Sequence, residues 1–245
     1  MTDTAESDVR HDVSIASRIL AEHNHGDYIW GHVSVRDQDG RGFWLKPSGL
    51  GMDEVTPDVV HLVDFDGNVV LGEGSRHFEF PIHAEIMRAR PDVGAVVHSH
   101  APHAVALGAS GMPLRPVSHA ANLFSPPDVP RFTVTGDLIR TAALGRQLAD
   151  CLGDAPAAFL VNHGIVAVGA DVEIATCAAL LLEDACRLQL LTASLPGWPT
   201  WSDPVESLQK RDHAYPDHAL RAMWRYLVRR QTRREQHAFE TLDAR

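Results

Sequence analysis

Three histidines, His98, His100 and His103, lie within six residues of one another in the stretch VVHSHAPHA, directly after an apolar run. Imidazole nitrogens are common ligands of transition metals, so this stretch could bind a divalent cation. GAVVHSH has the character of a buried strand. Because side chains alternate across a strand, His98 and His100 point to one face and Ser99 to the other. The alternative is a pair of strand-end histidines that hydrogen-bond to nearby carbonyl groups.

His163 strengthens the metal interpretation. It ends a second apolar stretch, FLVNH, and Gly164 follows it directly, where glycine permits an unusual backbone angle. If the two strands end side by side, three imidazoles converge. Three neutral nitrogen ligands suit Zn²⁺, Mn²⁺, Fe²⁺ or Co²⁺ and leave positions open for a substrate. His103 falls one turn into the following helix, so we expect it beside the site rather than on the metal.

A carboxylate would complete such a site, and Glu79 is the candidate. It precedes Pro81 at the start of a predicted helix, where a negative charge is also favourable for electrostatic reasons alone. Both interpretations of Glu79 stay open on sequence grounds.

The elements that must position these residues follow from the hydrophobic pattern. The expected strands are HVSVRD with RGFWLK, the two halves of HLVDFDGNVVLGE, GAVVHSH, and the two halves of AAFLVNHGIVAVG, joined in part by hairpin turns. The expected helices cover residues 10–23, 80–90, 101–110, 136–152, 171–193 and a segment from about Asp217. Strands and helices interleave without an internal repeat. This order predicts one α/β domain with a mixed or antiparallel sheet covered by helices.

Composition limits the class of protein. The chain has 245 residues, of which 44% are apolar, as in soluble globular domains. A net charge of −10 argues against nucleic-acid binding, and no apolar run is long enough to span a bilayer. Three widely spaced cysteines and no recognisable signal segment predict a reducing, cytoplasmic location. The 15 histidines are an unusually high number and justify the search for a metal site.

At this point the sequence resembles the class II aldolase/adducin family. The matching stretches are GHVSVRD, LKPSGLGMDEVTPDVV, EFPIHAEIMRARPDVGAVVHSH and FLVNHGIVAVG, in family order over roughly residues 15–195. The resemblance implies an α/β/α sandwich with a central, mainly antiparallel sheet, and a homotetramer with active sites between subunits. It divides the chain into a flexible N-terminus (1–9), a catalytic domain (10–200) and an Arg-rich helical extension packed on that domain (201–245). A solvated helix face or a subunit contact accounts for the arginines of the extension better than an anion site does.

The resemblance also implies roles for single residues. By position, Glu79 matches the family's acidic residue that approaches the metal and moves protons. Ser48 and Gly49, in KPSGLG, match the substrate loop. His119 aligns with a tyrosine that family aldolases extend from the adjacent subunit. The implied metal ligands are His98, His100 and His163.

The departures from the family pattern point to the substrate. Phosphosugar aldolases carry two phosphate-binding serines before the acidic residue, and this sequence has Arg76, His77 and Phe78 there. His32 stands where an asparagine is usual. A guanidinium binds a carboxylate through two hydrogen bonds, so Arg76 with His77 suits an acidic substrate. A surface ion pair is the alternative for Arg76. The pattern is similar to the branch of the family that decarboxylates hydroxylated aromatic or pyridine dicarboxylates.

The sequence therefore predicts a metal-dependent carbon–carbon lyase, a decarboxylase of a hydroxylated aromatic or heteroaromatic acid in aromatic catabolism. Each subunit would bind one divalent ion, Mn²⁺ or Zn²⁺ foremost, with no nucleic-acid or membrane partner. Glu79 and His119 would move protons. The predicted substrate-binding residues are Ser48, Gly49, Arg76, His77 and His32. The alternatives are an aldolase that cleaves an unphosphorylated hydroxy or keto acid, and a non-catalytic adducin-like interaction module, which the intact histidine triad disfavours.

Overall fold

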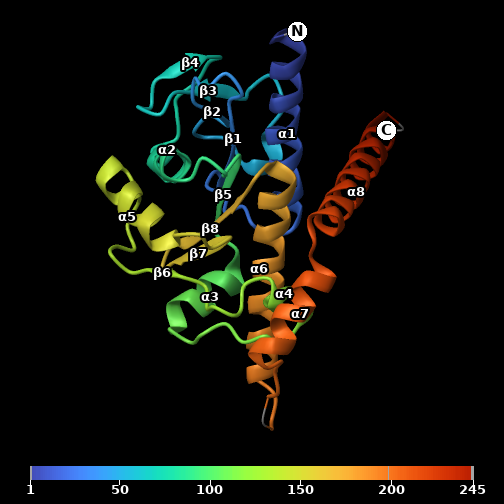
Figure 1. The fold of residues 1–245 in the computed structure, drawn as a ribbon. Helices are drawn as coiled ribbons and strands as arrows, with labels where there is room; N and C mark the ends of the chain where they lie inside the picture. The colour runs from blue at the N-terminus through green and yellow to red at the C-terminus, as the bar shows by residue number, and fades with distance from the viewer. Residues whose placement is uncertain (1, 198, 244–245) are drawn as a thin grey trace.

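One eight-stranded sheet forms the middle layer of the molecule (Figure 1). The structure is a computed structural model and describes residues 2–197 and 199–243. The strands lie in the order β4-β3-β2-β1-β5-β8-β7-β6, and neighbours pair antiparallel except β6 and β7, which are parallel. Their bounds are β1 His32–Arg36, β2 Phe43–Leu45, β3 His61–Val63, β4 Val69–Leu71, β5 Ala95–Ser99, β6 Arg131–Phe132, β7 Ala157–Leu160 and β8 Gly164–Gly169. The sheet is thus mainly antiparallel, as the sequence predicts.

Helices cover both faces of this sheet. The helices α2 and α5 pack on one face, and α1, α3 and α6 pack on the other, with α8 outside α1 and α6 (Figure 1). The bounds are α1 Thr2–Glu22, α2 Phe80–Ala89, α3 Pro102–Ser110, α4 His119–Asn122, α5 Ala142–Leu152, α6 Val172–Ala193, α7 Pro204–Ala214 and α8 Asp217–Asp243. This arrangement is the predicted α/β/α sandwich.

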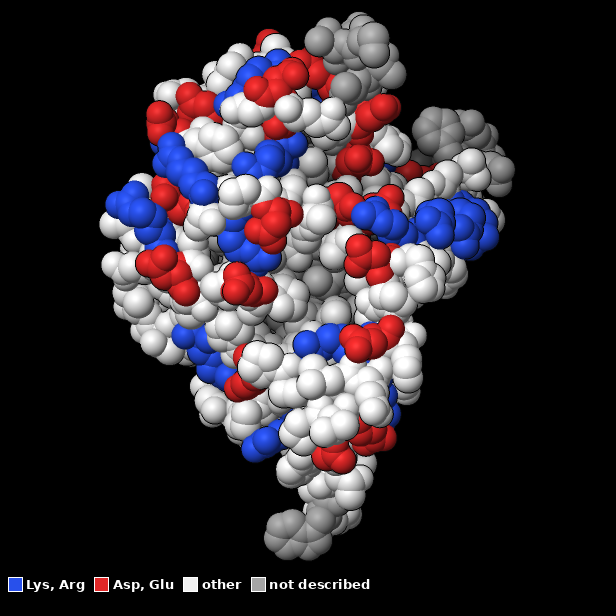
Figure 2. Space-filling model, in the orientation of Figure 1, with Lys and Arg blue, Asp and Glu red and all other residues white. Residues whose placement is uncertain are grey.

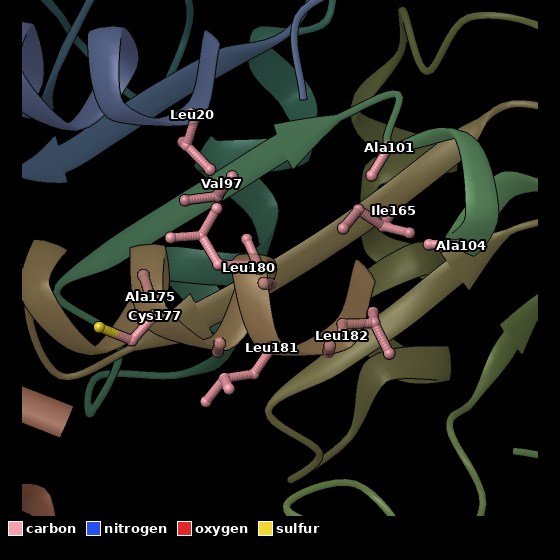
Figure 3. Close-up of a cluster of buried hydrophobic side chains, with 14 of the residues drawn as sticks. Leu20, Val97, Ala101, Ala104, Ile165, Ala175, Cys177, Leu180, Leu181 and Leu182 are labelled. Carbon is pink, nitrogen blue, oxygen red and sulfur yellow. The ribbon is translucent and has the colours of Figure 1, made fainter. Parts of the chain in front are cut away.

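The alternation of side chains along β5 explains why both faces must be covered. Val96 lies in one apolar cluster with Ile82 of α2. Its neighbour Val97 lies in the other cluster with Leu20 of α1 and Leu182 of α6 (Figure 3). All five side chains are buried, and each such burial contributes about 1.5–3 kcal/mol relative to exposure. The strand that carries His98 is therefore held from both sides.

The sequence prediction is wrong at the starts of two helices. The segment 1–9 was expected to be irregular, but α1 begins at Thr2, where acidic residues favour a helix N-terminus; Met1 lies outside the described residues. The helix expected from residue 136 begins at Ala142, because Thr141 caps it by accepting a hydrogen bond from the Leu144 N–H. The short elements α4 and β6 were not expected. Helix α7 lies within the segment 201–245, which was expected to be helical.

The C-terminal helices contribute to the core. Leu220, Trp224 and Leu227 of α8 are buried in the same apolar cluster as α1 and α6. Basic side chains gather over α8 in Figure 2, while the rest of that face mixes both charges. Within residues 2–197 and 199–243, no helix is both long and apolar enough to cross a membrane.

Candidate active site

The three histidines of the predicted triad meet at one end of the sheet. The potential ligand atoms of His98, His100 and His163 all lie within 4.8 Å of one another. His98 is on β5, and His163 lies in the tight turn between β7 and β8. Because β5 pairs with β8, with His98 opposite Val166, the turn that carries His163 lies beside the end of β5.

Hydrogen bonding orients His98 for a metal. Its Nδ1–H donates to the Ile165 carbonyl oxygen at 2.9 Å. A carbonyl only accepts, so the proton is on Nδ1 and Nε2 presents a lone pair. The Nε2 atoms of His98 and His100 and both ring nitrogens of His163 are buried without a hydrogen-bond partner among the described residues. Such nitrogens are rare in proteins, and together they fit a divalent cation. Carbonyl hydrogen bonding alone does not account for them.

Gly164 was expected to adopt an unusual backbone angle, but the residue with positive φ in this turn is Asn162, at +62°. Glycine is needed at position 164 because a side chain would have no space there. A Cβ there would lie 2.5 Å from the Ser99 carbonyl oxygen and 2.9 Å from Cδ2 of His100. The backbone N–H of His100 donates to the His25 carbonyl at 3.2 Å. His103 lies outside the triad, where its Nδ1 contacts Glu183 Oε1 at 2.5 Å.

Glu79 lies directly beside the triad. It precedes α2 and is 2% exposed. Its Oε2 is 3.7 Å from His98 Nε2, and its Oε1 is 3.6 Å from His163 Nε2. Oε1 also accepts a hydrogen bond from the Ile139 N–H at 2.8 Å. Burial alone would raise the pKa of Glu79, but His163, His98 and the Ile139 N–H together lower that pKa to about 2. Glu79 is therefore ionised, and it can accept a proton before it donates one.

Glu79 also belongs to a second cluster, with His32 and His77. Potential ligand atoms of these three residues lie within 4.8 Å of one another. His32 is the Cα partner of His98 across β1 and β5, and its ring centroid is 4.0 Å from that of His77. His32 Nε2 and His77 Nδ1 are buried and accept or donate no hydrogen bond within the described chain. The structure thus brings two of the predicted substrate residues next to Glu79.

Two residues behind His32 were missed by sequence reasoning. His83 of α2 contacts His32 Nδ1 through its Nε2 at 2.5 Å, and its own Nδ1 contacts Ser34 Oγ at 2.6 Å. All three residues are fully buried. Burial lowers the pKa of His83 to about 3 and that of His77 to about 4, so both rings are neutral near pH 7. The i, i+2 spacing of His32 and Ser34 on one strand was the available signal.

The predicted substrate loop lies against the segment that carries His77. The Ser48 N–H donates to the Ser75 carbonyl at 2.8 Å, and Gly49 is exposed with φ +92°. Arg76 places its guanidinium 4.3 Å from the Phe80 ring centroid. The guanidinium therefore packs on the first residue of α2, the neighbour of Glu79 in the sequence.

Lys46 supplies a buried cation in the same loop. Its Nζ donates to the carbonyl oxygens of Ile29 at 3.0 Å and Leu50 at 2.6 Å. Burial lowers its pKa to about 8. Burial and the charge of Lys46 both contribute to the low pKa of His77. A positive charge near His77 favours an anionic ligand there.

His119 lies apart from the triad within this chain. It is the exposed first residue of α4 and lines a separate cavity of about 340 Å³ with Trp201 and Lys210. The predicted role of His119 was in the site of a neighbouring subunit, and that role stays a prediction.

An α/β/α sandwich with three histidines and a carboxylate converging at strand ends defines the class of metal-dependent aldolases and their relatives. Residues 11–190 match the model of the family "Class II Aldolase and Adducin N-terminal domain". The chain belongs to this family.

Sequence and structure comparisons identify known proteins that are similar to this chain. The chain is 31% identical to 3,4-dihydroxyphthalate decarboxylase of Arthrobacter keyseri over 201 residues, covering 77% of this chain and 80% of that protein. It is 30% identical to the Meiotically up-regulated gene 14 protein of Schizosaccharomyces pombe over 211 residues, covering 84% and 77%. The solved L-fuculose 1-phosphate aldolase from Glaciozyma antarctica PI12 superimposes with a TM-score of 0.85 at 25% identity, covering 97% of this chain and 93% of that one. Decarboxylases and aldolases both break carbon–carbon bonds, and the chain is a lyase.

Proposed function

We propose that this lyase is a divalent-metal-dependent decarboxylase of an aromatic acid with adjacent hydroxyl and carboxyl groups, of the class of 3,4-dihydroxyphthalate. One observation carries the proposal. Glu79 contacts a triad suited to a cation and also lies close to His32 and His77, which align with phosphate-binding positions of phosphosugar aldolases. The similarity to the Arthrobacter keyseri decarboxylase supports the same assignment.

The metal would be held by His98, His100 and His163. When bound, it supplies a Lewis acid that stabilises negative charge on a substrate oxygen. Nitrogen ligands of this kind suit Mn²⁺ or Zn²⁺, and also Fe²⁺ or Co²⁺. Gly164 keeps the ligand geometry fixed, because any side chain there would collide with His100.

Glu79 would carry the proton. Since it is ionised in the free enzyme, it can take the proton of the substrate hydroxyl. The bond between the ring and the carboxyl carbon then breaks, carbon dioxide leaves, and the electron pair stays on the ring carbon. The proton moves from Glu79 to that carbon, so one proton is taken and one returned. The Ile139 N–H holds Oε1 of Glu79 in place during both transfers.

A second carboxylate of the substrate would bind beside Glu79. His77 and His32 lie there with buried nitrogens that have no partner among the described residues, and Lys46 adds positive charge near His77. Arg76 precedes His77 in the sequence and packs on Phe80. Ser48 and Gly49 belong to the loop that is hydrogen-bonded to the same segment. These groups favour a dianionic acid over a neutral sugar.

We further infer a homotetramer in which His119 of a neighbouring copy closes the site. His119 is exposed and lines a cavity that no residue of its own chain's triad lines, so it is available to another subunit. An imidazole there could donate the proton to carbon in place of Glu79.

The proposal is tested by supplying the Mn²⁺-loaded protein with 3,4-dihydroxyphthalate and with other ortho-hydroxylated aromatic and pyridine dicarboxylates. Carbon dioxide and aldehyde are measured in the same mixtures. We expect carbon dioxide without aldehyde, and no release from the His98→Ala variant. Aldehyde from hydroxy-keto acids without carbon dioxide would instead establish an aldolase. Metal binding without turnover of any of these compounds would favour an interaction module.

A further inference from the structure

The residue types in the cluster of His32, His77 and Glu79 do not by themselves decide whether it binds a cation or an anion. Its ligand atoms are close enough to hold a second cation, yet the same nitrogens could instead donate to an anion. We propose that Ser34 and His83 are positioning residues that keep the proton of His32 on Nε2. His32 is thereby a hydrogen-bond donor to a substrate carboxylate rather than a ligand of a second metal. The identity of that anion rests on the proposed decarboxylase function.

Ser34 is fully buried. Its only hydrogen-bond contact within the described chain is His83 Nδ1, at 2.6 Å. If Ser34 accepted a proton from His83, its own O–H would be left without an acceptor. A buried unsatisfied donor is costly. Ser34 therefore donates, and Nδ1 of His83 carries the lone pair.

The direction of the hydrogen bond between Ser34 and His83 also determines the tautomer of His32. A neutral imidazole has one N–H, so a lone pair on His83 Nδ1 places the proton of His83 on Nε2. This N–H donates to Nδ1 of His32 across 2.5 Å. Nδ1 of His32 is thus an acceptor, and the proton of His32 is on Nε2. A metal ligand needs a lone pair at that position, so His32 is unsuited to a second cation.

Glu79 does not account for the N–H of His32. The Oε1 atom of Glu79 accepts from Ile139 and faces His163, and its Oε2 faces His98. His32 Nε2 has no partner in the described part of the chain. An incoming carboxylate oxygen would satisfy this donor, with Lys46 contributing positive charge to the same region.

The proton positions can be observed directly. Neutron crystallography of the perdeuterated, metal-loaded protein should show deuterium on Ser34 Oγ, His83 Nε2 and His32 Nε2. Deuterium on His32 Nδ1, or a second metal at His32, would overturn the inference. Because this measurement needs no turnover, it is independent of whether the protein decarboxylates anything. Correct proton positions with no carbon dioxide from any acid would overturn only the proposed function.

Kinetics of Ser34 variants test the consequence for binding. In Ser34→Ala the proton of His32 is free to move to Nδ1, so we expect KM for 3,4-dihydroxyphthalate to rise about 5–20-fold, the scale of a weakened hydrogen bond to a charged group. The value of kcat and the metal content of one ion per chain should stay unchanged. Ser34→Thr keeps the hydroxyl and should restore KM. Ser17→Ala is the matched control, because Ser17 is equally buried but donates to the Val13 carbonyl in α1.

A double-mutant cycle separates positioning from simple packing. An amide at position 32 has an N–H donor that no tautomer can remove, so in a His32→Asn background Ser34→Ala should have no further effect on KM. Additive effects of the two substitutions would show that Ser34 acts through packing, and would overturn the inference.

Discussion

His98 and His32 lie opposite each other on paired strands, yet the hydrogen bonds at their Nδ1 atoms run in opposite directions. His98 Nδ1 meets a carbonyl oxygen, which can only accept a proton. His32 Nδ1 meets His83, which Ser34 turns into a donor. One ring therefore presents a lone pair to the site and the other an N–H. The group that hydrogen-bonds to Nδ1 of a histidine therefore decides whether its Nε2 suits a cation or an anion.

The largest loss of activity is expected from a substitution in the triad of His98, His100 and His163. His98→Gln should abolish metal content and lower carbon dioxide release by roughly a thousandfold or more, because the main stabiliser of negative charge is lost. Metal analysis and turnover measure both. His61→Gln is a matched control. His61 is also buried and also meets a carbonyl through Nδ1, at Glu73, but it belongs to neither metal-ligand group found in the described residues. Full activity in His98→Gln would contradict the cation assignment.

Glu79 should affect chemistry more than metal content. In Glu79→Gln the proton carrier is lost while the three imidazoles remain, so kcat should fall by about 10²–10⁴ with the metal retained. Turnover under saturating substrate and metal analysis on the same sample test this. If the variant instead loses its metal as completely as His98→Gln, Glu79 is primarily a ligand.

His119 offers a smaller effect that crosses the subunit boundary. His119→Phe should lower kcat by roughly 10²-fold, the low end for a positioned proton donor. Mixed assemblies of His119→Phe and His98→Gln chains should regain activity, because each chain supplies what the other lacks. Mixtures that stay as inactive as their parents would place His119 outside the active site. His213→Phe is a suitable control, since His213 is exposed on α7.

Low pH should affect the free energy of unfolding rather than catalysis. Its effect on activity is therefore the smallest of those expected. The pKa of His83 is lowered to about 3 by burial, below the ordinary value near 6.5. The unfolded chain therefore binds the proton first. The stability that depends on neutral His83 is complete above pH 6.5 and is lost as the pH falls from there toward 3.

For the metal-free protein, each such histidine should cost about 1.4 kcal/mol of unfolding free energy per pH unit below 6.5. Denaturant unfolding between pH 6 and pH 5 measures the slope, and His83→Gln should reduce it by one proton. An equal slope in the wild type and in His83→Gln would show that His83 titrates alike in both states.

Much of the fold and of the triad could be predicted from local sequence. The alternation in HSH predicts which side chains share a face. The turn between β7 and β8 was expected at Asn162–His163–Gly164, although the left-handed backbone angle falls on Asn162 and Gly164 already begins β8. Hairpin residues fix β1 with β2 and β3 with β4. These are short-range signals, and the strand pairing confirmed the three expected hairpins.

Other features depend on contacts between distant segments. The Ile139 N–H reaches Glu79 from 60 residues away, and any residue type except proline could supply it. His83 meets His32 from a different element, 51 residues apart. The helix α4 is only four residues long, too short for a periodic pattern. No local pattern encodes such contacts, because tertiary packing decides them.

Glu79 borders both clusters, and this shared position couples their occupancy. A cation at the triad offsets the negative charge that would otherwise repel an incoming acid. An acid bound at His32 in turn offsets part of the charge that the cation brings. Thermodynamic reciprocity then requires that each ligand raise the affinity for the other by the same factor. Under the proposed function, the supply of the aromatic acid would thus govern how firmly the protein keeps its metal, and a cell short of that acid would hold a larger share of the protein in the metal-free form.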